Sequence, residues 1–441
     1  MWLEWLLLAL LLPLLMLWLA ERPGLRYLDG IVYDRLLEAM PVAPSDEQVL
    51  IVVDRGSLDA LGPLPWSHAT HARLLQTLAA HRPRAVLLDL ALDRPVSPTD
   101  DPAPLVAAMA QLPVFLVRRD VVGAAEPTLR PPLPELSAAA AGVGHSRWVP
   151  GQDGVVRSLY AQEGPADHRI PYVGLLLAGR SPALPGNDPT CASPCPDAWL
   201  RTGQFGFARA DMMESRPPTL SYVQVLRGDV SAAQLRGRDV LIGLGNDAEL
   251  GDQWPVSAWH PALRLPGAQL HGYAIDALRR ERTVTAVDGV ARLLWIVLPL
   301  WLGLYLFARR ERHAALAGLG LVAMCAMGSA VLMTQQLWLS PVAPALGLMA
   351  GYLLWSWRRQ ALMFAYFRRQ LAKLDGRVSE VEGPVPSPVR ALHTAEQHML
   401  ALDDAVERLK TLQRLFRQGL RDLPVAVLLC GRDGTGRHAN P

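Results

Sequence analysis

The sequence predicts an α/β domain exported across a membrane, four transmembrane α-helices, and a cytoplasmic coiled-coil helix that follows them. Three observations lead to this fold class. Apolar spans of about 20 residues, the length that crosses a bilayer core, occur four times in the 441-residue chain. Strand-like apolar runs alternate with helical patterns between the first and second spans, and a heptad-like seam follows the fourth. The expected segments are 1–20, 21–289, 290–357, 358–422 and 423–441.

The composition agrees with a chain that lies partly in lipid. Of its residues 51% are hydrophobic and only 19% are charged. The formal net charge is +2, and the basic residues are almost all arginines beside apolar spans, so nucleic acid is excluded as a partner. The four cysteines are too few for a disulfide scaffold.

The first span, residues 2–20, is apolar except for Glu4 and is expected to be an uncleaved anchor. A cleaved signal peptide is the alternative. Such a peptide has a basic start and small residues before the cleavage site, whereas Trp18 occupies one of those positions here.

Three further spans are expected at 290–308, 314–334 and 337–357. Arginines cluster after the second span, at 309–312, and after the fourth, at 358–369. Because cytoplasmic loops carry the excess of basic residues, both clusters are expected in the cytoplasm. Residues 21–289 and the turn Gln335–Gln336 are then outside, and the C-terminus is cytoplasmic.

The exported region shows the alternation of a parallel sheet covered on both faces. Apolar strands are expected at 48–54, 84–90 and 113–118, with helices at 67–81 and 103–111 between them. Further elements are expected in this order: a strand at 153–162, helices near 171–179 and 219–227, a strand at 239–245, and a helix at 267–282.

Asp54 and Asp89 each close an apolar strand, which in an open parallel sheet is the edge where ligands usually bind. A ligand pocket is therefore expected among Asp54, Trp66, Asp89 and Arg157. The alternatives are a helix N-cap or a salt bridge for each aspartate. Arg157 could clamp an anionic ligand or pair with one of these two aspartates.

Residues 65–71 read PWSHATH and place His68 and His71 three apart at the start of a helix. A scaffold or cap role, a sensing role for an imidazole that titrates near neutral pH, and a metal site are the alternatives. A metal site needs a third ligand that the sequence does not identify, so no metal is expected. No catalytic residue is expected either, because no serine, histidine and aspartate set occurs in a hydrolase context.

Cys191 and Cys195 enclose three residues in a proline-rich exported loop. An oxidising compartment favours a small disulfide between them. A free pair is the alternative. Cys325 lies inside the third span and is expected to serve packing only.

After the fourth span the helix is expected to continue to about Leu374, and the glycine and prolines of 375–389 predict a hinge. Apolar residues then follow a three–four alternation over 392–420. This seam predicts a dimeric coiled coil. An amphipathic helix that packs on another domain is the alternative.

Several short stretches of the exported region occur together in a fixed order. They are Tyr33-Asp34, VVDRGSLDALGPLPW (52–66), RAVLLDLAL (84–92), DGVVR (153–157), LSYVQVLRGD (220–229), DVLIGLGNDAELGD (239–252) and LPGAQLHGYAIDAL (265–278). Over about residues 24–285 the chain resembles a CHASE2 domain, whose family typically has three closely spaced spans after it. The resemblance implies an extracytoplasmic sensor with an unknown ligand. His68 departs from the family, which commonly has an arginine near this position.

The last stretch, 423–441, predicts a strand, an Asp-Gly turn and a second strand, and it is similar to the opening of a PAS domain. So short a piece buries no core, so the chain is expected to be cut inside a larger protein.

The two resemblances imply the sensing and relay part of a bacterial sensor histidine kinase. Such a receptor is a multi-pass homodimer in the inner (plasma) membrane, with a response regulator as its partner. No cofactor is expected in this chain, since ATP and magnesium are implied only for a missing kinase domain. A nucleotide cyclase output is one alternative, and a membrane-anchored binding or scaffold protein without catalytic output is another.

Overall fold

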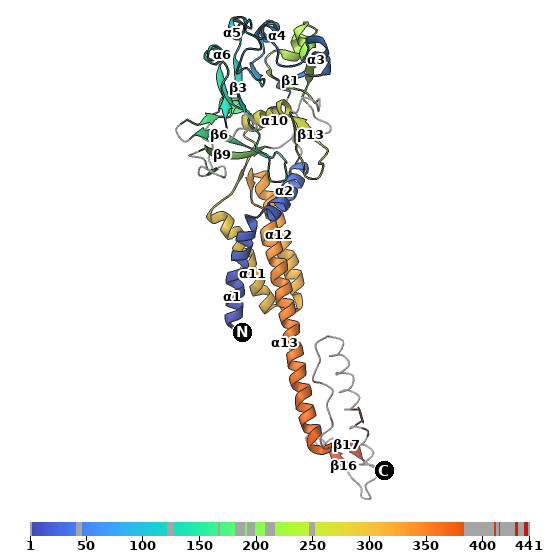
Figure 1. The fold of residues 1–441 in the computed structure, drawn as a ribbon. Helices are drawn as coiled ribbons and strands as arrows, with labels where there is room; N and C mark the ends of the chain where they lie inside the picture. Colours follow the sequence, from blue (N-terminus) through green and yellow to red (C-terminus); the bar gives the residue numbers. More distant parts are fainter. Residues whose placement is uncertain are drawn as a thin grey trace. The chain divides into compact units, whose positions relative to one another are not determined.

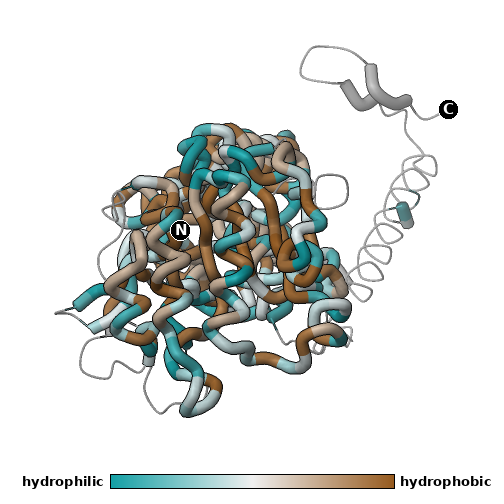
Figure 2. Tube along the Cα trace, turned by 90° about the horizontal axis from the view of Figure 1, so that it is seen from above, coloured by the Kyte–Doolittle hydropathy of each residue, from teal (hydrophilic) through white to brown (hydrophobic). Residues whose placement is uncertain are grey.

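A computed structural model of the chain consists of two compact units, Met1–Leu353 and Leu354–Pro441, which are described separately. The structure describes residues 2–40, 46–120, 128–165, 168–180, 190–191, 199–207, 217–246, 252–382, 410–411, 414, 428–430 and 436–439. Seen from above, hydrophobic residues run through the middle of the folded part and hydrophilic ones lie mostly around its edge (Figure 2).

A seven-stranded sheet forms the centre of the α/β domain, in the order β10-β1-β11-β2-β3-β4 with β5 also paired to β3. All pairings are parallel except that of the short edge strand β4. The strands are β1 (Gln48–Val53), β2 (Ala85–Leu88), β3 (Val114–Asp120), β4 (Leu129–Arg130), β5 (Gly142–His145), β10 (Thr219–Ser221) and β11 (Asp239–Leu244). The predicted parallel sheet is confirmed.

Helices cover both faces of this sheet, because its strands are apolar on both sides. Val49 and Ile51 belong to the core of one face and Leu50 to the core of the other. The first face is covered by α3 (Arg55–Leu61), α4 (His68–His81), α5 (Ala103–Met109), α6 (Pro134–Ala139), α8 (Tyr222–Leu226) and α9 (Ala232–Leu235). The second is covered by α7 (Val173–Ala178) and α10 (Gly267–Arg279).

A second, six-stranded sheet packs against the other side of α10 and was not predicted. Figure 1 shows α10 between the parallel sheet and strands β6 and β9. This sheet runs β15-β14-β9-β6-β7, with β8 also paired to β9. Its strands are β6 (Ser158–Pro165), β7 (Ile170–Pro171), β8 (Thr190–Cys191), β9 (Trp199–Phe207), β14 (Thr283–Ala286) and β15 (Leu337–Trp338). A small hairpin joins β12 (Gln253–Pro255) to β13 (Arg264–Pro266).

Two predicted elements of the α/β domain are wrong in part. The helix expected over 219–227 begins as strand β10, because Thr219–Ser221 pairs with β1 and only Tyr222–Leu226 is helical. The strand expected from residue 153 begins at Ser158. The residues before it form a turn in which Asp153 accepts a hydrogen bond from the Val155 amide.

The remaining α-helices are α1 (Trp2–Ala20), α2 (Pro23–Glu38), α11 (Val290–Arg309), α12 (Ala314–Thr334) and α13 (Val342–Glu382). Among the described residues, two helical stretches, Val290–Arg309 and Glu311–Thr334, are long and apolar enough to cross a membrane. The pair α1 and α2 makes a third if the two count as one span, bent by 75°. Leu12 and Met16 of α1 pack with Leu300 of α11 and Leu348 of α13.

The fourth predicted span, 337–357, differs from the structure at its start. Leu337 and Trp338 form strand β15, and the helix begins only at Val342. That helix, α13, passes through Asp375 and Gly376 and ends at Glu382, so the helix end expected near Leu374 is eight residues too early. One glycine in a long helix costs only about 1 kcal/mol relative to alanine, too little to stop it.

Several predictions fall on residues outside those described. The coiled-coil seam over 392–420 is one, apart from three isolated positions. The Cys191–Cys195 disulfide is another, since Cys195 and the side chain of Cys191 lie outside the described set. In the second unit, β16 (Leu428–Cys430) and β17 (Gly436–Ala439) pair antiparallel, as the predicted strand, turn and strand require.

Candidate functional site

Asp54 follows β1 and is the N-cap of α3. Its Oδ1 accepts hydrogen bonds from the Ser57 amide (2.9 Å), the Ser57 hydroxyl (2.6 Å) and the Ser221 hydroxyl (2.9 Å). Burial opposes ionisation, but these hydrogen bonds outweigh it and lower the pKa of Asp54. The N-cap alternative therefore accounts for this residue.

Trp66 is a buried residue between the start of α4 and α8. Its Nε1 donates to the carbonyl oxygen of Gly62 at 2.9 Å, and its ring centroid lies 4.8 Å from that of Tyr222. His71 completes this group, with Nδ1 2.8 Å from the Tyr222 hydroxyl. The group fixes α4 against α8, which is a scaffold role.

His68 is the first residue of α4 and is buried with Asp100. The Asp100 carboxylate accepts a hydrogen bond from the backbone amide of His68 at 2.9 Å. Its second oxygen lies 2.9 Å from His68 Nδ1. Asp100 thus satisfies one of the free amides at the helix start, beside the N-cap Ser67. Within the part of the chain that the structure describes, no three metal-binding side chains converge.

The buried His71 predicts loss of stability in acid. Burial of the imidazole, reinforced by nearby His68, lowers the pKa of His71 to about 4. The unfolded chain takes up this proton near pH 6.5, so stability is full above that pH and falls between pH 6.5 and 4, by about 2 kcal/mol at pH 5. We compare the free energy of unfolding, measured by denaturant, at pH 7.5 and at pH 5. His71→Asn is expected to make the difference between these two values smaller by this amount.

His260→Asn, a change at an exposed histidine, is the matched control and leaves the pH dependence intact. Part of the acid loss persists in both variants, because burial also lowers the pKa of His145, to about 3. An unchanged pH dependence in His71→Asn would contradict the assignment.

Asp89, at the carboxyl end of β2, faces a buried histidine of α10 that the sequence analysis did not identify. Asp89 Oδ2 lies 3.4 Å from His271 Nε2, and the Tyr172 hydroxyl lies 2.7 Å from His271 Nδ1. Trp148 stacks on the same imidazole with ring centroids 4.4 Å apart. Burial, with the charge of Asp89, raises the pKa of Asp252, which lies beside the α10 N-terminus. Polar groups therefore gather at this edge of the sheet.

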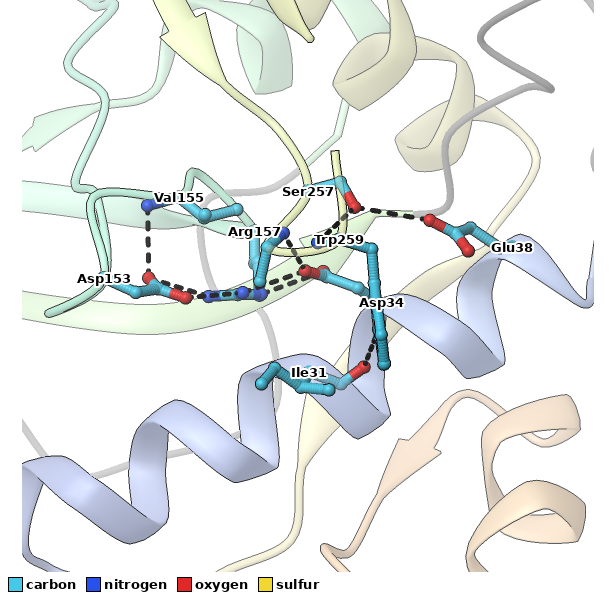
Figure 3. Close-up of polar contacts among 9 residues, drawn as sticks. Ile31, Asp34, Glu38, Asp153, Val155, Arg157, Ser257 and Trp259 are labelled. Atoms are coloured by element: carbon cyan, nitrogen blue, oxygen red, sulfur yellow. Dashed lines mark hydrogen bonds and ion pairs between the residues drawn. The ribbon is translucent and has the colours of Figure 1, made fainter. Parts of the chain in front are cut away.

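Arg157 lies away from that edge, where it joins β6 to α2 (Figure 3). Its Nε and Nη2 each donate to Asp34 at 2.9 Å, and its Nη1 and Nη2 donate to Asp153 at 3.0 and 2.6 Å. Burial opposes the charge, but the two carboxylates outweigh it and raise the pKa of Arg157. The predicted pairing of Arg157 with Asp54 or Asp89 is wrong, because Asp34 and Asp153 hold both sides of the guanidinium.

The loop after β12 also holds α2 (Figure 3). The Ala258 amide donates to Asp34 at 2.9 Å, and Trp259 Nε1 donates to the carbonyl oxygen of Ile31 at 3.2 Å. The guanidinium of Arg35 lies 3.9 Å above the Trp259 ring, a cation–π contact. One face of α2 is thus fixed to the α/β domain.

Two glycines allow α2 to approach this closely. A Cβ at Gly30 would lie 2.8 Å from Arg157 Cζ, and a Cβ at Gly206 would lie 2.3 Å from the Tyr33 hydroxyl. Both distances are shorter than side-chain contacts allow. The absence of a side chain at these positions therefore allows α2 to contact β9 and Arg157.

Helices α11, α12 and α13 are joined to the same domain through β14 and β15. The Thr285 amide donates to the Gln336 carbonyl at 2.9 Å and the Val287 amide to the Trp338 carbonyl at 3.0 Å. Trp338 also packs edge-on against Tyr33 of α2, with ring centroids 5.0 Å apart. Since β14 leads into α11 and β15 connects α12 to α13, the second sheet is joined directly to these three helices.

A family model of the CHASE2 domain matches residues 7–306, which is more than half of the chain. The chain belongs to the CHASE2 domain family. CHASE2 is an extracellular sensor domain, so residues between α1 and α11 form the sensor of this protein. No curated protein and no solved structure matches the chain. The CHASE2 match extends the similarity noted over 24–285 into α1 and α11.

The residues predicted for one CHASE2 pocket divide into three places. Asp54 and Trp66 contact adjacent residues, Ser221 and Tyr222, at the start of α8. Asp89 contacts His271, and Arg157 belongs to the junction with α2. Asp34 and Asp153 occur in the Tyr33-Asp34 and DGVVR motifs, but no local pattern indicates that they share one arginine.

Proposed function

We propose that this CHASE2 protein is the sensing and relay part of a bacterial transmembrane receptor, with a sensor histidine kinase as its output. The observation that carries the proposal is the double attachment of the sensor to the membrane helices. Arg157 binds Asp34 on α2, and β14 pairs with β15 between α12 and α13. A change in the second sheet therefore displaces the helices directly.

The ligand site in this proposal is the carboxyl edge around Asp89. Parallel α/β sheets bind ligands at that edge, and Asp89, Asp252 and His271 gather there. A ligand that contacts α10 acts on both sheets, because α10 lies between them. The ligand shifts the receptor only by its difference in affinity for the two states.

The proposed topology has four spans: α1, α11, α12 and the first part of α13. It places residues 21–289 outside the bacterial inner membrane and the C-terminus in the cytoplasm. Arginines at both ends of the loop from Arg309 to Arg312 support this direction. Apolar side chains exposed on α11 and α12, such as Leu298 (53%) and Leu319 (67%), suit contact with lipid.

The proposed output is reached through α13 and a coiled coil over 392–420 that joins two copies of the chain. The β16–β17 hairpin supports the opening of a PAS domain after it. A kinase domain that follows binds ATP and magnesium and transfers phosphate to a response regulator. A nucleotide cyclase in place of the kinase leaves the sensor and relay unchanged, and phosphate transfer from ATP in the full-length receptor distinguishes the two.

Reporter fusions test the membrane part of this proposal. We expect alkaline phosphatase to be active when fused after Asp288 or Gln336, and green fluorescent protein to fluoresce after Arg312 or Glu382. Each position is tested with both reporters, so that each fusion controls the other. An inactive phosphatase with a fluorescent partner after Asp288 would place the CHASE2 domain inside the cell and contradict the proposal.

A further inference from the structure

An apolar groove runs between α1 and α11 and has a volume of about 490 Å³. Its lining residues are Trp5, Leu6, Ala9, Trp301, Leu304, Tyr305 and Ala308. Among the lining residues Leu304 is buried, whereas Leu6, Trp301 and Tyr305 remain more than half exposed. The groove is therefore open along the outer surface of the helix pair.

A proline explains how the two helices are held at the groove. Pro13 lies inside α1 and has no N–H group, so the carbonyl of Ala9, four residues earlier, loses its helical donor. Trp301 Nε1 donates to that carbonyl at 2.9 Å. An unsatisfied carbonyl is costly in lipid, so this hydrogen bond fixes the large indole between the helices.

The groove reaches the end of α11 at Ala308, and three exposed arginines, Arg309, Arg310 and Arg312, follow this residue in the chain. Within the described part of the chain none of these three forms an ion pair with a carboxylate. Arginine binds phosphate through paired hydrogen bonds and keeps its charge at any physiological pH. An apolar groove that ends at such a cluster matches a molecule with one long apolar part and one anionic end.

We propose that the groove holds an acyl chain of an anionic phospholipid whose phosphate is bound by Arg309, Arg310 and Arg312. The inference rests on the proposed membrane placement of α1 and α11. A second copy of this chain is a poorer occupant, because packing about a two-fold axis would bring the same three arginines together. The lipid instead neutralises them.

Native mass spectrometry of the whole chain, released from vesicles of equal phosphatidylglycerol and phosphatidylcholine, tests the site. We expect the wild type to retain one lipid molecule, and the amount of retained phosphatidylglycerol to be at least ten times that of phosphatidylcholine. Ala9→Phe fills the groove and is expected to lower this retention at least fivefold. The triple change R309Q, R310Q and R312Q is expected to abolish the preference for phosphatidylglycerol while a lipid is still retained.

Leu319→Phe, at an exposed position of α12, is the matched control and retains lipid as the wild type does. If Ala9→Phe lowers the melting temperature, Ala308→Phe fills the groove from the other helix and repeats the test. Equal retention in the groove and control variants would leave only general lipid contact and overturn the proposal. If no lipid is retained and Ala9→Phe converts a dimer to a monomer, the groove would be assigned to a second copy of the chain and the proposal overturned. The reporter fusions are read in the same variants, so a failure of the membrane placement is seen separately.

Discussion

Arg157→Ala is expected to lower the free energy of unfolding of the sensor by about 3–5 kcal/mol, because it removes the guanidinium cation from the buried carboxylate of Asp34. Asp34 is only 1% exposed and loses both hydrogen bonds from the guanidinium. The amide of Ala258 remains its partner but carries no charge. Thermal and denaturant unfolding of the purified chain measure the loss.

Arg26→Ala is the control for this change. The Arg26–Glu21 pair is about half exposed on both sides, so its loss is expected to cost about 1 kcal/mol or less. A second variant, Asp34→Leu with Arg157→Met, removes both charges and is expected to regain much of the stability, since an apolar pair of similar volume often replaces a buried ion pair. If Arg157→Ala unfolded like Arg26→Ala, the Arg157–Asp34 pair would not hold α2.

Gly206→Ala is expected to move α2 away from the second sheet and to cost about 1–3 kcal/mol by overpacking. The new methyl would lie 2.3 Å from the hydroxyl of Tyr33, which is itself buried. Tyr33→Phe removes the atom in the way. We therefore expect the double variant, Gly206→Ala with Tyr33→Phe, to have a melting temperature close to that of Tyr33→Phe alone.

The same variants test whether the movement reaches α13 beyond its proposed membrane span. A cysteine in place of Leu362, an exposed residue of α13, serves as a label in a chain without its native cysteines. We expect Gly206→Ala to change its labelling rate and the Tyr33→Phe addition to restore it. Gly24→Ala, where the added methyl meets nothing, is the control. Equal labelling rates in all variants would contradict the relay.

The parallel sheet could be predicted because long apolar runs, such as 48–54 and 84–90, carry their own signal. The second sheet could not be predicted from the sequence. Its strand β15 is only two residues long, and it pairs with residues 52 positions earlier. The sequence identified Asp89 and Arg157 but not their partners. Asp34 lies 123 residues from Arg157 and His271 far beyond Asp89, and no periodicity reports contacts at such a separation.

The pairing of β14 with β15 rests mainly on main-chain atoms: the Thr285 and Val287 amides and two carbonyl oxygens, with one longer side-chain bond from the Thr285 hydroxyl at 3.5 Å. Any residue except proline supplies the same atoms at these donor positions. The link can therefore survive wide sequence divergence, and alanine scanning would pass over it. It also restricts independent movement of α11, α12 and α13 at the ends nearest this sheet. A stimulus cannot drive one of them as a lone piston, and the three must tilt or turn as one body.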